Sequence, residues 1–279
     1  MNHSKPILKV DHLTKYYGTP CPNYLAKGCT HPNSNTCAEC GCLFAANAVS
    51  FSLMPGEILG VIGESGSGKS TLLKMLVMDS LASSGTIELN LDGKTIDVNQ
   101  LNAAQKRALR NHKFGIVYQN PHLGLNFKVS AGGNIAERVL MKGQRDYGYI
   151  RQRASLLLER AEVSSARMDE LPGNFSGGMQ QRVQIAKALA TEPDILFLDE
   201  ITTGLDLSVQ AKILDLILEL QQTLSISMIV VTHDLGVVRT LADRTLVMQH
   251  GRVIESGLTD QVLEDPQHAY TQQLVASSL

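Results

Sequence analysis

A glycine-rich segment between two apolar runs of different period constrains the fold more than any other part of the sequence. The segment GESGSGKS (63–70) follows the β-favouring run EILGVIG (57–63) and leads into STLLKMLVMDSL (70–81), whose apolar residues recur at helical spacing. This order predicts a strand, a tight turn and a helix. The three glycines of the turn permit the torsions that aim several backbone N–H groups at one anion, and the start of the helix adds positive potential. We therefore expect a phosphate-binding loop.

The polar side chains of this loop suit a nucleoside triphosphate bound with Mg²⁺. Lys69 is placed to reach the terminal phosphates, and Ser70 is placed to supply an oxygen to the metal. A chance glycine-rich turn is the alternative, but the flanking strand and helix argue against it. The predicted ATP-contacting residues of the loop are Gly63, Glu64, Ser65, Gly66, Ser67, Gly68, Lys69, Ser70 and Thr71.

Two carboxylates end a second apolar run, ILFLDE (195–200). A buried strand that ends in Asp199 and Glu200 places both acids at the carboxyl edge of a sheet, where ligands bind in such folds. Asp199 is expected to hold Mg²⁺ through water, and Glu200 to polarise the attacking water, because phosphoryl transfer depends on orienting the nucleophile and stabilising charge. Two solvated acids at a strand end are the alternative interpretation.

A second helix start suited to anions lies in NFSGGMQQR (174–182). Ser176, Gly177 and Gly178 expose backbone N–H groups where a Gln-rich, apolar-periodic helix begins, and the helix dipole points the same way. Taken alone, this tripeptide would be only a helix cap.

Taken in order, these segments are those of a known family. The set comprises GESGSGKS, Gln119 in VYQNP, FSGGMQQR, LFLDE, Asp206 in GLD, and His233 in VTHD, within a match from Leu8 to Leu279. The chain thereby resembles the ATP-binding cassette (ABC) superfamily. The resemblance implies an ATP hydrolase that dimerises head to tail, so that the SGG segment of one subunit caps the γ-phosphate held by the glycine loop of the other.

The resemblance also assigns roles to single residues. It gives Gln119 to the metal and to coupling with a partner, His233 to the γ-phosphate, Asp206 to the dimer seam and Tyr17 to stacking on adenine, with Tyr16 as the adjacent competitor. A surface amide, a strand-end histidine and simple packing are the alternatives for Gln119, His233 and Tyr17. The chain departs from the family at Ile201, where a proline usually follows the catalytic glutamate. Hydrolysis is still expected, with an altered turn.

The expected fold class is α/β: a P-loop NTPase of the ABC type with an antiparallel β subdomain, a helical subdomain and a Cys-rich insertion. The ATP-binding core with its antiparallel subdomain is placed at 1–120 and 177–279, the helical subdomain at 121–176 and the insertion at 19–46. Two alternating runs, PILKV and AVSFSL, bracket the insertion and predict paired strands. Alternating strands and helices in the remainder predict a largely parallel, buried sheet.

The sequence resembles two subgroups of the superfamily. A third subgroup, the DNA-repair relatives, carries a long coiled coil between the glycine loop and SGG. Only about a hundred residues intervene here, which argues against that subgroup. The segments SGGMQQR and DPQHAYTQQL resemble the dipeptide, oligopeptide and nickel importer ATPases, whose partner is a membrane permease. The segments VSAGGNIAER, YGYIR, LSVQAKILDL, VTHDLGVVRTLADR and ESGLTDQVLEDPQHAYTQQLVASSL resemble the ATP-binding proteins of bacterial carbon–phosphorus lyase systems. The second resemblance is preferred, and it implies a soluble lyase core as partner and a dimer with itself or a paralogous ABC protein.

All five cysteines lie between positions 21 and 42. The net charge of −2 gives no broad reason to expect nucleic acid, and the absence of a leader or of an apolar run of ~18 residues predicts a cytosolic location. In a reducing compartment such a cluster is more often metal-binding or redox-active than disulfide-linked. A structural Zn²⁺ is preferred over an iron–sulfur cluster or free thiols. The candidate ligands are Cys21, Cys29, Cys37 and Cys40, with Cys42 or His31 as substitutes.

Overall fold

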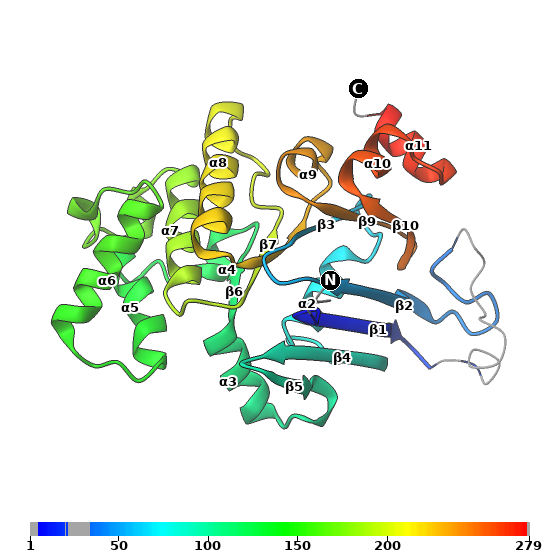
Figure 1. Cartoon of the computed structure of the whole chain (residues 1–279), viewed down its shortest axis with the longest axis horizontal. Helices are drawn as coiled ribbons and strands as arrows, with labels where there is room; N and C mark the ends of the chain where they lie inside the picture. The colour runs from blue at the N-terminus through cyan, green and yellow to red at the C-terminus, as the bar shows by residue number, and fades with distance from the viewer. Residues whose placement is uncertain (1–4, 20, 22–33, 278–279) are drawn as a thin grey trace. The chain divides into compact units, whose positions relative to one another are not determined.

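The computed structural model describes residues 5–19, 21 and 34–277, which divide into two compact units (Figure 1). Unit 1 comprises 1–101 and 231–279, and unit 2 comprises 102–230. The predicted boundaries of core, insertion and helical subdomain stay predictions.

Unit 1 contains a four-stranded sheet in the order β2-β1-β4-β5. Its strands are β1 (Leu8–Tyr17), β2 (Leu43–Leu53), β4 (Ser84–Leu91) and β5 (Lys94–Asp97), and the turn η1 (Val98–Gln100) follows β5. The two runs that bracket the cysteine segment pair in antiparallel fashion, as expected, with Leu8 opposite Leu53 and Tyr17 opposite Leu43. The cysteine segment is therefore the connection between two paired strands.

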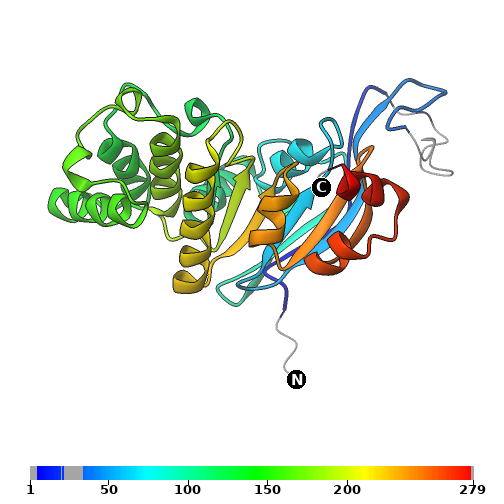
Figure 2. The same ribbon diagram turned by 90° about the horizontal axis from the view of Figure 1, so that it is seen from above.

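The rest of unit 1 is a three-stranded element in the order β10-β9-β3, with β3 parallel and β10 antiparallel to β9. Ile62, Val238, Val247, Leu263 and Tyr270 form its apolar core. Figures 1 and 2 show α10 and α11 beside β9 and β10. The elements are β3 (Ile58–Ile62), α2 (Lys69–Leu76), α9 (Leu235–Leu241), β9 (Arg244–Gln249), β10 (Arg252–Leu258), α10 (Thr259–Glu264) and α11 (Ala269–Ala276).

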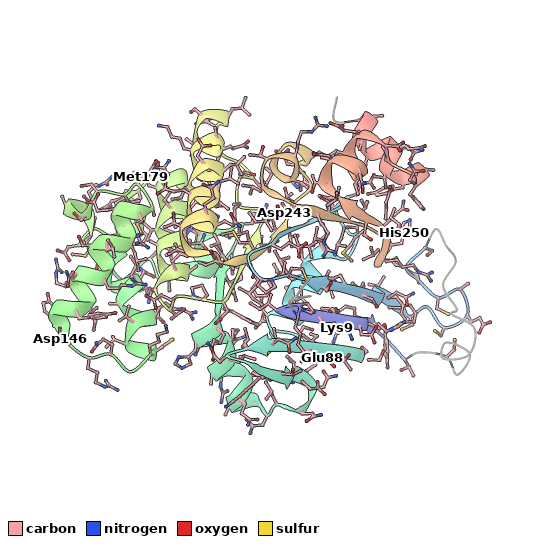
Figure 3. The ribbon with its side chains drawn as sticks, in the orientation of Figure 1. Lys9, Glu88, Asp146, Met179, Asp243 and His250 are labelled. Carbon is pink, nitrogen blue, oxygen red and sulfur yellow. The ribbon has the colours of Figure 1, made fainter. Side chains whose placement is uncertain are left out.

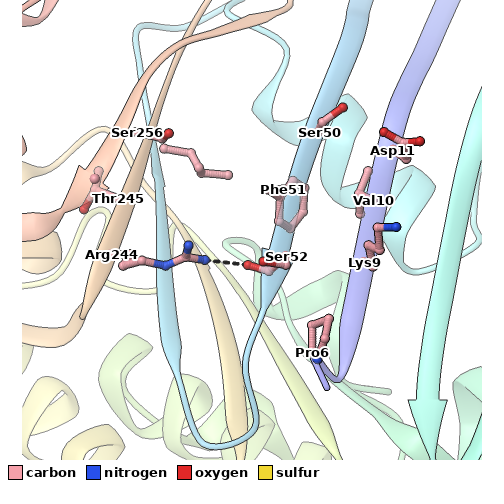
Figure 4. A pocket seen from close by; sticks show the side chains of 12 residues that line it. Pro6, Lys9, Val10, Asp11, Ser50, Phe51, Ser52, Arg244, Thr245 and Ser256 are labelled. Atoms are coloured by element: carbon pink, nitrogen blue, oxygen red, sulfur yellow. Dashed lines mark hydrogen bonds between the residues drawn. The ribbon is translucent and has the colours of Figure 1, made fainter. Parts of the chain in front are cut away.

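A hollow of about 700 Å³ lies between β1, β2, β9 and β10 in unit 1 (Figure 4). Arg244 crosses it, donating to the Ser52 carbonyl at 2.5 Å and pairing with Glu57, which is 9% exposed. The glycine-rich loop contributes no residue to its lining. The hollow is thus bridged by Arg244 and is separate from the predicted phosphate loop.

Unit 2 holds strands in the order β8-β7-β6, of which β6 and β7 are parallel. The rings of Phe114 and Phe197 meet edge to face, with 5.1 Å between their centroids, in its core. The strands are β6 (Phe114–Val117), β7 (Ile195–Asp199) and β8 (Ser227–Val231). The helices and turns are α3 (Ala103–Lys113), α4 (Pro121–Gly124), α5 (Ala131–Met141), α6 (Tyr147–Arg160), η2 (Ser165–Arg167), η3 (Pro172–Asn174), α7 (Gly177–Leu189) and α8 (Leu207–Leu224).

Helices α5 and α6 of unit 2 begin at side-chain caps, and α8 buries one face. Asp146, labelled in Figure 3, accepts from the Tyr149 amide at 2.6 Å at the start of α6, and Ser130 does the same for Gly133 in α5. On α8 an apolar stripe is buried at Ile213, Leu216, Ile217 and Leu220. Within the described part of the chain, no helix combines the length and apolar character needed to cross a membrane.

Candidate functional site

The phosphate loop follows β3 and enters α2, and two of its glycines occupy places where a side chain would clash with the backbone. Gly63 has φ of 148°, and an added Cβ would lie 2.2 Å from the Met248 carbonyl oxygen. Gly68 has φ of 105°, and its Cβ would lie 2.2 Å from the Ala45 carbonyl oxygen. These two glycines therefore serve the turn and its close packing.

Lys69 is 5% exposed, and its ammonium is held inside the loop. The Nζ atom donates to the carbonyl oxygens of Gly63 at 2.6 Å and Glu64 at 2.9 Å. A buried charge is stable only when it is hydrogen-bonded, so the loop carbonyls offset the desolvation of this cation. The arrangement concentrates positive charge within the loop, which suits an anionic ligand.

Neighbouring strands hold the loop from behind. The amide of Gly251, in the turn that carries His250 between β9 and β10 (Figure 3), donates to the Ser67 carbonyl at 2.9 Å. The Gly251 carbonyl in turn accepts from the Asn47 amide of β2 at 2.7 Å. A preorganised loop of this kind loses little conformational entropy when it binds an anion.

Tyr270 of α11 is a positioning residue that the sequence analysis did not select. Its hydroxyl oxygen accepts a hydrogen bond from the Glu64 amide at 2.9 Å, and the side chain is 7% exposed. Burial raises the pKa of this phenol, so the hydroxyl stays protonated at neutral pH. Tyr270 lies in the segment DPQHAYTQQL, which distinguishes subgroups of the family. Nothing local in that segment indicates a contact with a loop 206 residues away.

Glu255 of β10 fixes the segment that carries Tyr270. Its two carboxylate oxygens accept from the amides of Gln267 at 2.7 Å and His268 at 3.0 Å. Burial opposes ionisation of Glu255, but these hydrogen bonds favour the charged form, and the pKa of the carboxyl lies below its usual value. The carboxylate is thus an ionised clamp on the entry to α11.

Of the other predicted residues of unit 1, Ser65, Gly66 and Ser70 are exposed and Thr71 is half-buried. His233 is also exposed, and it lines a hollow of about 320 Å³ together with Leu263 and Val275. These placements leave the polar side chains accessible to a ligand.

The two adjacent tyrosines at the end of β1 differ in environment. The Tyr16 ring packs against Phe44, with 5.8 Å between centroids. The Tyr17 ring is 51% exposed, and the Lys15 ammonium lies 5.4 Å from its centroid. Tyr16 is thus committed to packing, which supports the choice of Tyr17 as the residue available for stacking.

In unit 2, Asp199 and Glu200 stand together at the end of β7. Glu200 has φ of 47°, a left-handed conformation that is uncommon for a residue other than glycine and that often marks functional sites. The Thr203 hydroxyl lies 3.4 Å from the Glu200 carboxylate. Ile201, which replaces the usual proline of the family, is 3% exposed. The departure is therefore a buried apolar side chain directly after the predicted base.

The SGG segment begins α7. Ser176 caps the helix by accepting from the Met179 amide at 3.4 Å, and Gly177 is exposed. Gly178 is buried because Val209 of α8 packs against it: an added Cβ would lie 2.4 Å from Val209 Cγ1. Asp206 is exposed at the start of α8, and its side chain makes no capping hydrogen bond.

Two buried glutamines of α7 support the backbone beside Gln119, and sequence reasoning missed them. Gln184 accepts from the Tyr118 amide at 3.0 Å and donates to the Tyr118 carbonyl at 3.1 Å. Gln181 donates to the same carbonyl at 3.3 Å, and both side chains are 2% exposed. Gly124 admits this contact, since its Cβ would lie 2.0 Å from Gln184 Oε1. The available signal was the run of glutamines in a helix that is otherwise apolar-periodic.

Three of the predicted cysteine ligands come together in unit 1. The sulfurs of Cys21, Cys37 and Cys40 lie within 4.8 Å of one another. Backbone hydrogen bonds from Cys40 and then Glu39 lower the pKa of the buried Cys37 thiol to about 7, against the opposing effect of burial. Cys42 lies outside this trio, and its thiol donates to the Tyr17 carbonyl at 3.2 Å. The predicted ligand Cys29 and the substitute His31 fall outside the described residues.

Comparison with known proteins decides the family. A family model described as ABC transporter matches residues 46–203. The chain belongs to the ABC transporter family. It is an ABC-type ATPase, and the predicted P-loop fold class is confirmed. ATPases of this family use ATP with Mg²⁺.

Individual relatives of this ABC ATPase fall into two groups. The chain is 52% identical over 231 residues to the phosphonates utilization ATP-binding protein PhnK of Escherichia coli (strain K12), covering 83% of this chain and 90% of that protein. It is 37% identical over 278 residues to the dipeptide transport ATP-binding protein DppF of the same organism, covering 98% and 77%. The dimeric ATP-binding cassette MJ0796, in a post-hydrolysis state bound to ADP and Pi, superposes with a TM-score of 0.75 at 28% identity, covering 90% and 98%.

Proposed function

We propose that this ABC ATPase binds ATP through its phosphate loop and hydrolyses it with Glu200 as the general base. The geometry of the loop carries the proposal: Lys69 is buried within it, and Gly63 and Gly68 leave no room for a side chain. His233 would contact the γ-phosphate and Tyr17 would stack on adenine. Mg²⁺, held by Ser70, Gln119 and Asp199, would neutralise phosphate charge.

The active form that we propose is a head-to-tail dimer, in which Ser176, Gly177 and Gly178 of one subunit cap the nucleotide of the other and Asp206 lies at the seam. The accessibility of this surface supports the proposal, because Ser176, Gly177 and Asp206 are exposed and the adjacent Leu207 is 83% exposed. A dimeric relative, MJ0796, adds support.

The partner that we propose is the soluble core of a carbon–phosphorus lyase, in the cytosol where ATP is supplied. The 52% identity to PhnK supports this choice. Closed ATP-bound and open dimers would bind the lyase core with unequal affinity, which is the condition for nucleotide to drive its rearrangement. A membrane permease of the dipeptide, oligopeptide or nickel type is the alternative, favoured by the match to DppF over 98% of this chain.

Replacement of the proposed base tests the catalytic part. Glu200→Gln should retain ATP binding, stop phosphate release and accumulate a stable ATP-bound dimer on size-exclusion chromatography. Glu219→Gln, an exposed change on α8, is the matched control and should hydrolyse ATP at the wild-type rate. Undiminished phosphate release by Glu200→Gln would overturn the assignment of Glu200.

Affinity purification of the native protein separates the two partners. With the Glu200→Gln variant and ATP, co-purification of soluble lyase subunits would support the first proposal. Co-purification with membranes and a multispan protein would replace it with the permease. A nucleotide-independent yield of lyase subunits would contradict the proposed coupling.

We also propose a structural Zn²⁺ in the cysteine-rich connection between β1 and β2. The three clustered sulfurs support it, because thiolates in tetrahedral array are the ligands that zinc prefers. The absence of both zinc and iron from protein purified without a chelator would contradict a metal at this place.

A further inference from the structure

The spacing of the clustered sulfurs matches a thiolate metal site rather than a disulfide. Sulfurs at the corners of a tetrahedron with metal–sulfur bonds of about 2.3 Å lie roughly 3.8 Å apart. The Sγ atoms of Cys21 and Cys37 are 3.8 Å apart, and all three sulfurs of the trio lie within 4.8 Å of one another. A disulfide would bring two sulfurs to about 2.05 Å.

The backbone around the trio is already folded as a metal-binding knuckle. Cys37 and Cys40 have the C-x-x-C spacing, and Gly41, directly after them, has φ of 67°. The Gly41 amide donates to the Cys37 carbonyl at 2.9 Å, and the Cys37 amide donates to the Cys42 carbonyl at 2.9 Å. The left-handed glycine lets the chain reverse so that both thiols face one side.

The three thiols come from both ends of the connection between β1 and β2. Cys21 lies four positions after Tyr17, the last residue of β1, whereas Cys37 and Cys40 precede β2. A metal held by all three therefore crosslinks the chain leaving β1 to the chain entering β2. Such a crosslink stabilises a small element that cannot bury an apolar core of its own.

Beneath the trio, a continuous set of contacts reaches Tyr17. The Cys42 thiol donates to the Tyr17 carbonyl at 3.2 Å, and Leu43 is paired with both Tyr17 and Thr36. Cys21 and Tyr16 pack against the buried cluster of Cys37, Cys42 and Phe44. The knuckle and the end of β1 thus form one small packed unit, with the Tyr17 ring on its surface.

From this arrangement we infer that Cys21, Cys37 and Cys40 hold one Zn²⁺ that fixes the end of β1, so that affinity for adenine nucleotides depends on the metal. The inference rests on the proposed role of Tyr17 in stacking on adenine. Cys42 acts differently from the trio: it packs beneath the site and is not a ligand. Metal loss loosens the Tyr17 backbone and weakens stacking, whereas the phosphate loop keeps its own supports.

Metal content tests the ligand set first. Protein purified without a polyhistidine tag or chelator should contain about one zinc per chain by mass spectrometry, as expected for one such site. Cys21→Ser, Cys37→Ser and Cys40→Ser should each lose most of it. Cys42→Ser is the matched control, because its hydroxyl can still donate to the Tyr17 carbonyl, and it should retain the zinc. Zinc-free wild-type protein, or a full complement in Cys37→Ser, would overturn the site.

Calorimetric binding of the non-hydrolysable analogue AMP-PNP with Mg²⁺ tests the coupling. Removing zinc from wild-type protein with TPEN should raise the Kd roughly five-fold, which corresponds to about 1 kcal/mol of lost stacking. Adding ZnCl₂ should restore it, which excludes irreversible unfolding as the cause. Circular dichroism recorded alongside should show unchanged helix content.

The variant Tyr17→Ala separates failure of this inference from failure of the proposed function. If stacking is the route, Tyr17→Ala alone weakens AMP-PNP binding, and zinc removal from it has no further effect. If Tyr17→Ala weakens binding but zinc removal from wild type does not, the coupling is wrong and the adenine site stands. If Tyr17→Ala leaves the Kd unchanged, both the stacking role and the coupling are wrong.

Discussion

The phenol oxygen of Tyr270 lies 2.9 Å from the backbone nitrogen of Glu64 and accepts its hydrogen bond. This contact ties the C-terminal helix α11 to the first residue after Gly63 in the phosphate loop. The Glu64 amide belongs to the backbone of the phosphate loop, whose N–H groups bind the anion. Its hydrogen bond to Tyr270 therefore sets the shape of the loop before any ligand binds. Tyr270 thus contributes to the nucleotide site from the last turns of the chain.

Tyr270→Phe should therefore impair ATP turnover while the protein stays folded. The phenylalanine ring keeps the apolar packing but leaves the Glu64 amide without its acceptor, at a cost of about 1–3 kcal/mol if the loop does not relax. We expect kcat/KM for ATP to fall roughly ten-fold, equivalent to ~1.4 kcal/mol. Tyr149→Phe, at a 47% exposed tyrosine, is the control. Equal activity of the two variants would show that the contact is dispensable.

The Glu255 clamp should give the protein a pH-dependent part of its stability. Because the pKa of Glu255 is lowered on folding, its contribution is present above the unfolded value of about 4.3 and is lost as the pH falls through the folded value. Urea unfolding should show Glu255→Gln less stable than wild type by roughly 1 kcal/mol at pH 7, with the difference shrinking below about pH 4.3. Glu264→Gln, at an exposed position on α10, should show no such difference. A gap that is constant with pH would refute the clamp.

The two glycines of the SGG segment should separate packing from function. An added Cβ at Gly178 would lie 2.4 Å from Val209 Cγ1, whereas one at Gly177 would lie 3.6 Å from its nearest neighbour, Leu205 Cδ2. Gly178→Ala should reduce the free energy of unfolding by about 1–3 kcal/mol because the core is overpacked, and its melting temperature should fall accordingly. The double variant Gly178→Ala with Val209→Ala should recover part of the lost stability. Gly177→Ala should melt like wild type yet hydrolyse ATP slowly if it faces a partner's nucleotide. Normal activity of a folded Gly177→Ala variant would contradict that role.

Most of the elements that carry the predicted site could be predicted from the sequence, because their signals are local. The glycine loop after β3, the carboxylates ending β7 and the SGG start of α7 each combine a change of hydrophobic period with residues required by backbone geometry. The pairing of the strands that flank the cysteine segment was predictable for the same reason. The left-handed φ at Glu200 was not, since no local rule requires it of a glutamate.

The supporting residues escaped prediction because their partners are distant in sequence. Tyr270 reads as an apolar helix residue, and only the folded chain shows its hydroxyl at Glu64. The distinction between Cys42 and the other thiols is similar: spacing made it a substitute ligand, and the fold turned its thiol to the Tyr17 carbonyl. Hydrogen bonds between such separated groups leave no periodic trace in a single sequence.

Gln184 offers the sharpest test of how α7 supports the Gln119 segment. Gln184→Leu keeps the volume but removes the acceptor of the Tyr118 amide and one of the two donors to the Tyr118 carbonyl, so we expect a loss of about 1–3 kcal/mol in urea unfolding. Because Gln119 is the next residue, ATP turnover should fall further than stability alone explains at temperatures where the variant is fully folded. Gln152→Leu, at an exposed site on α6, is the control. If Gln184→Leu is as stable and active as this control, the Gln184 side chain has no part in positioning Gln119.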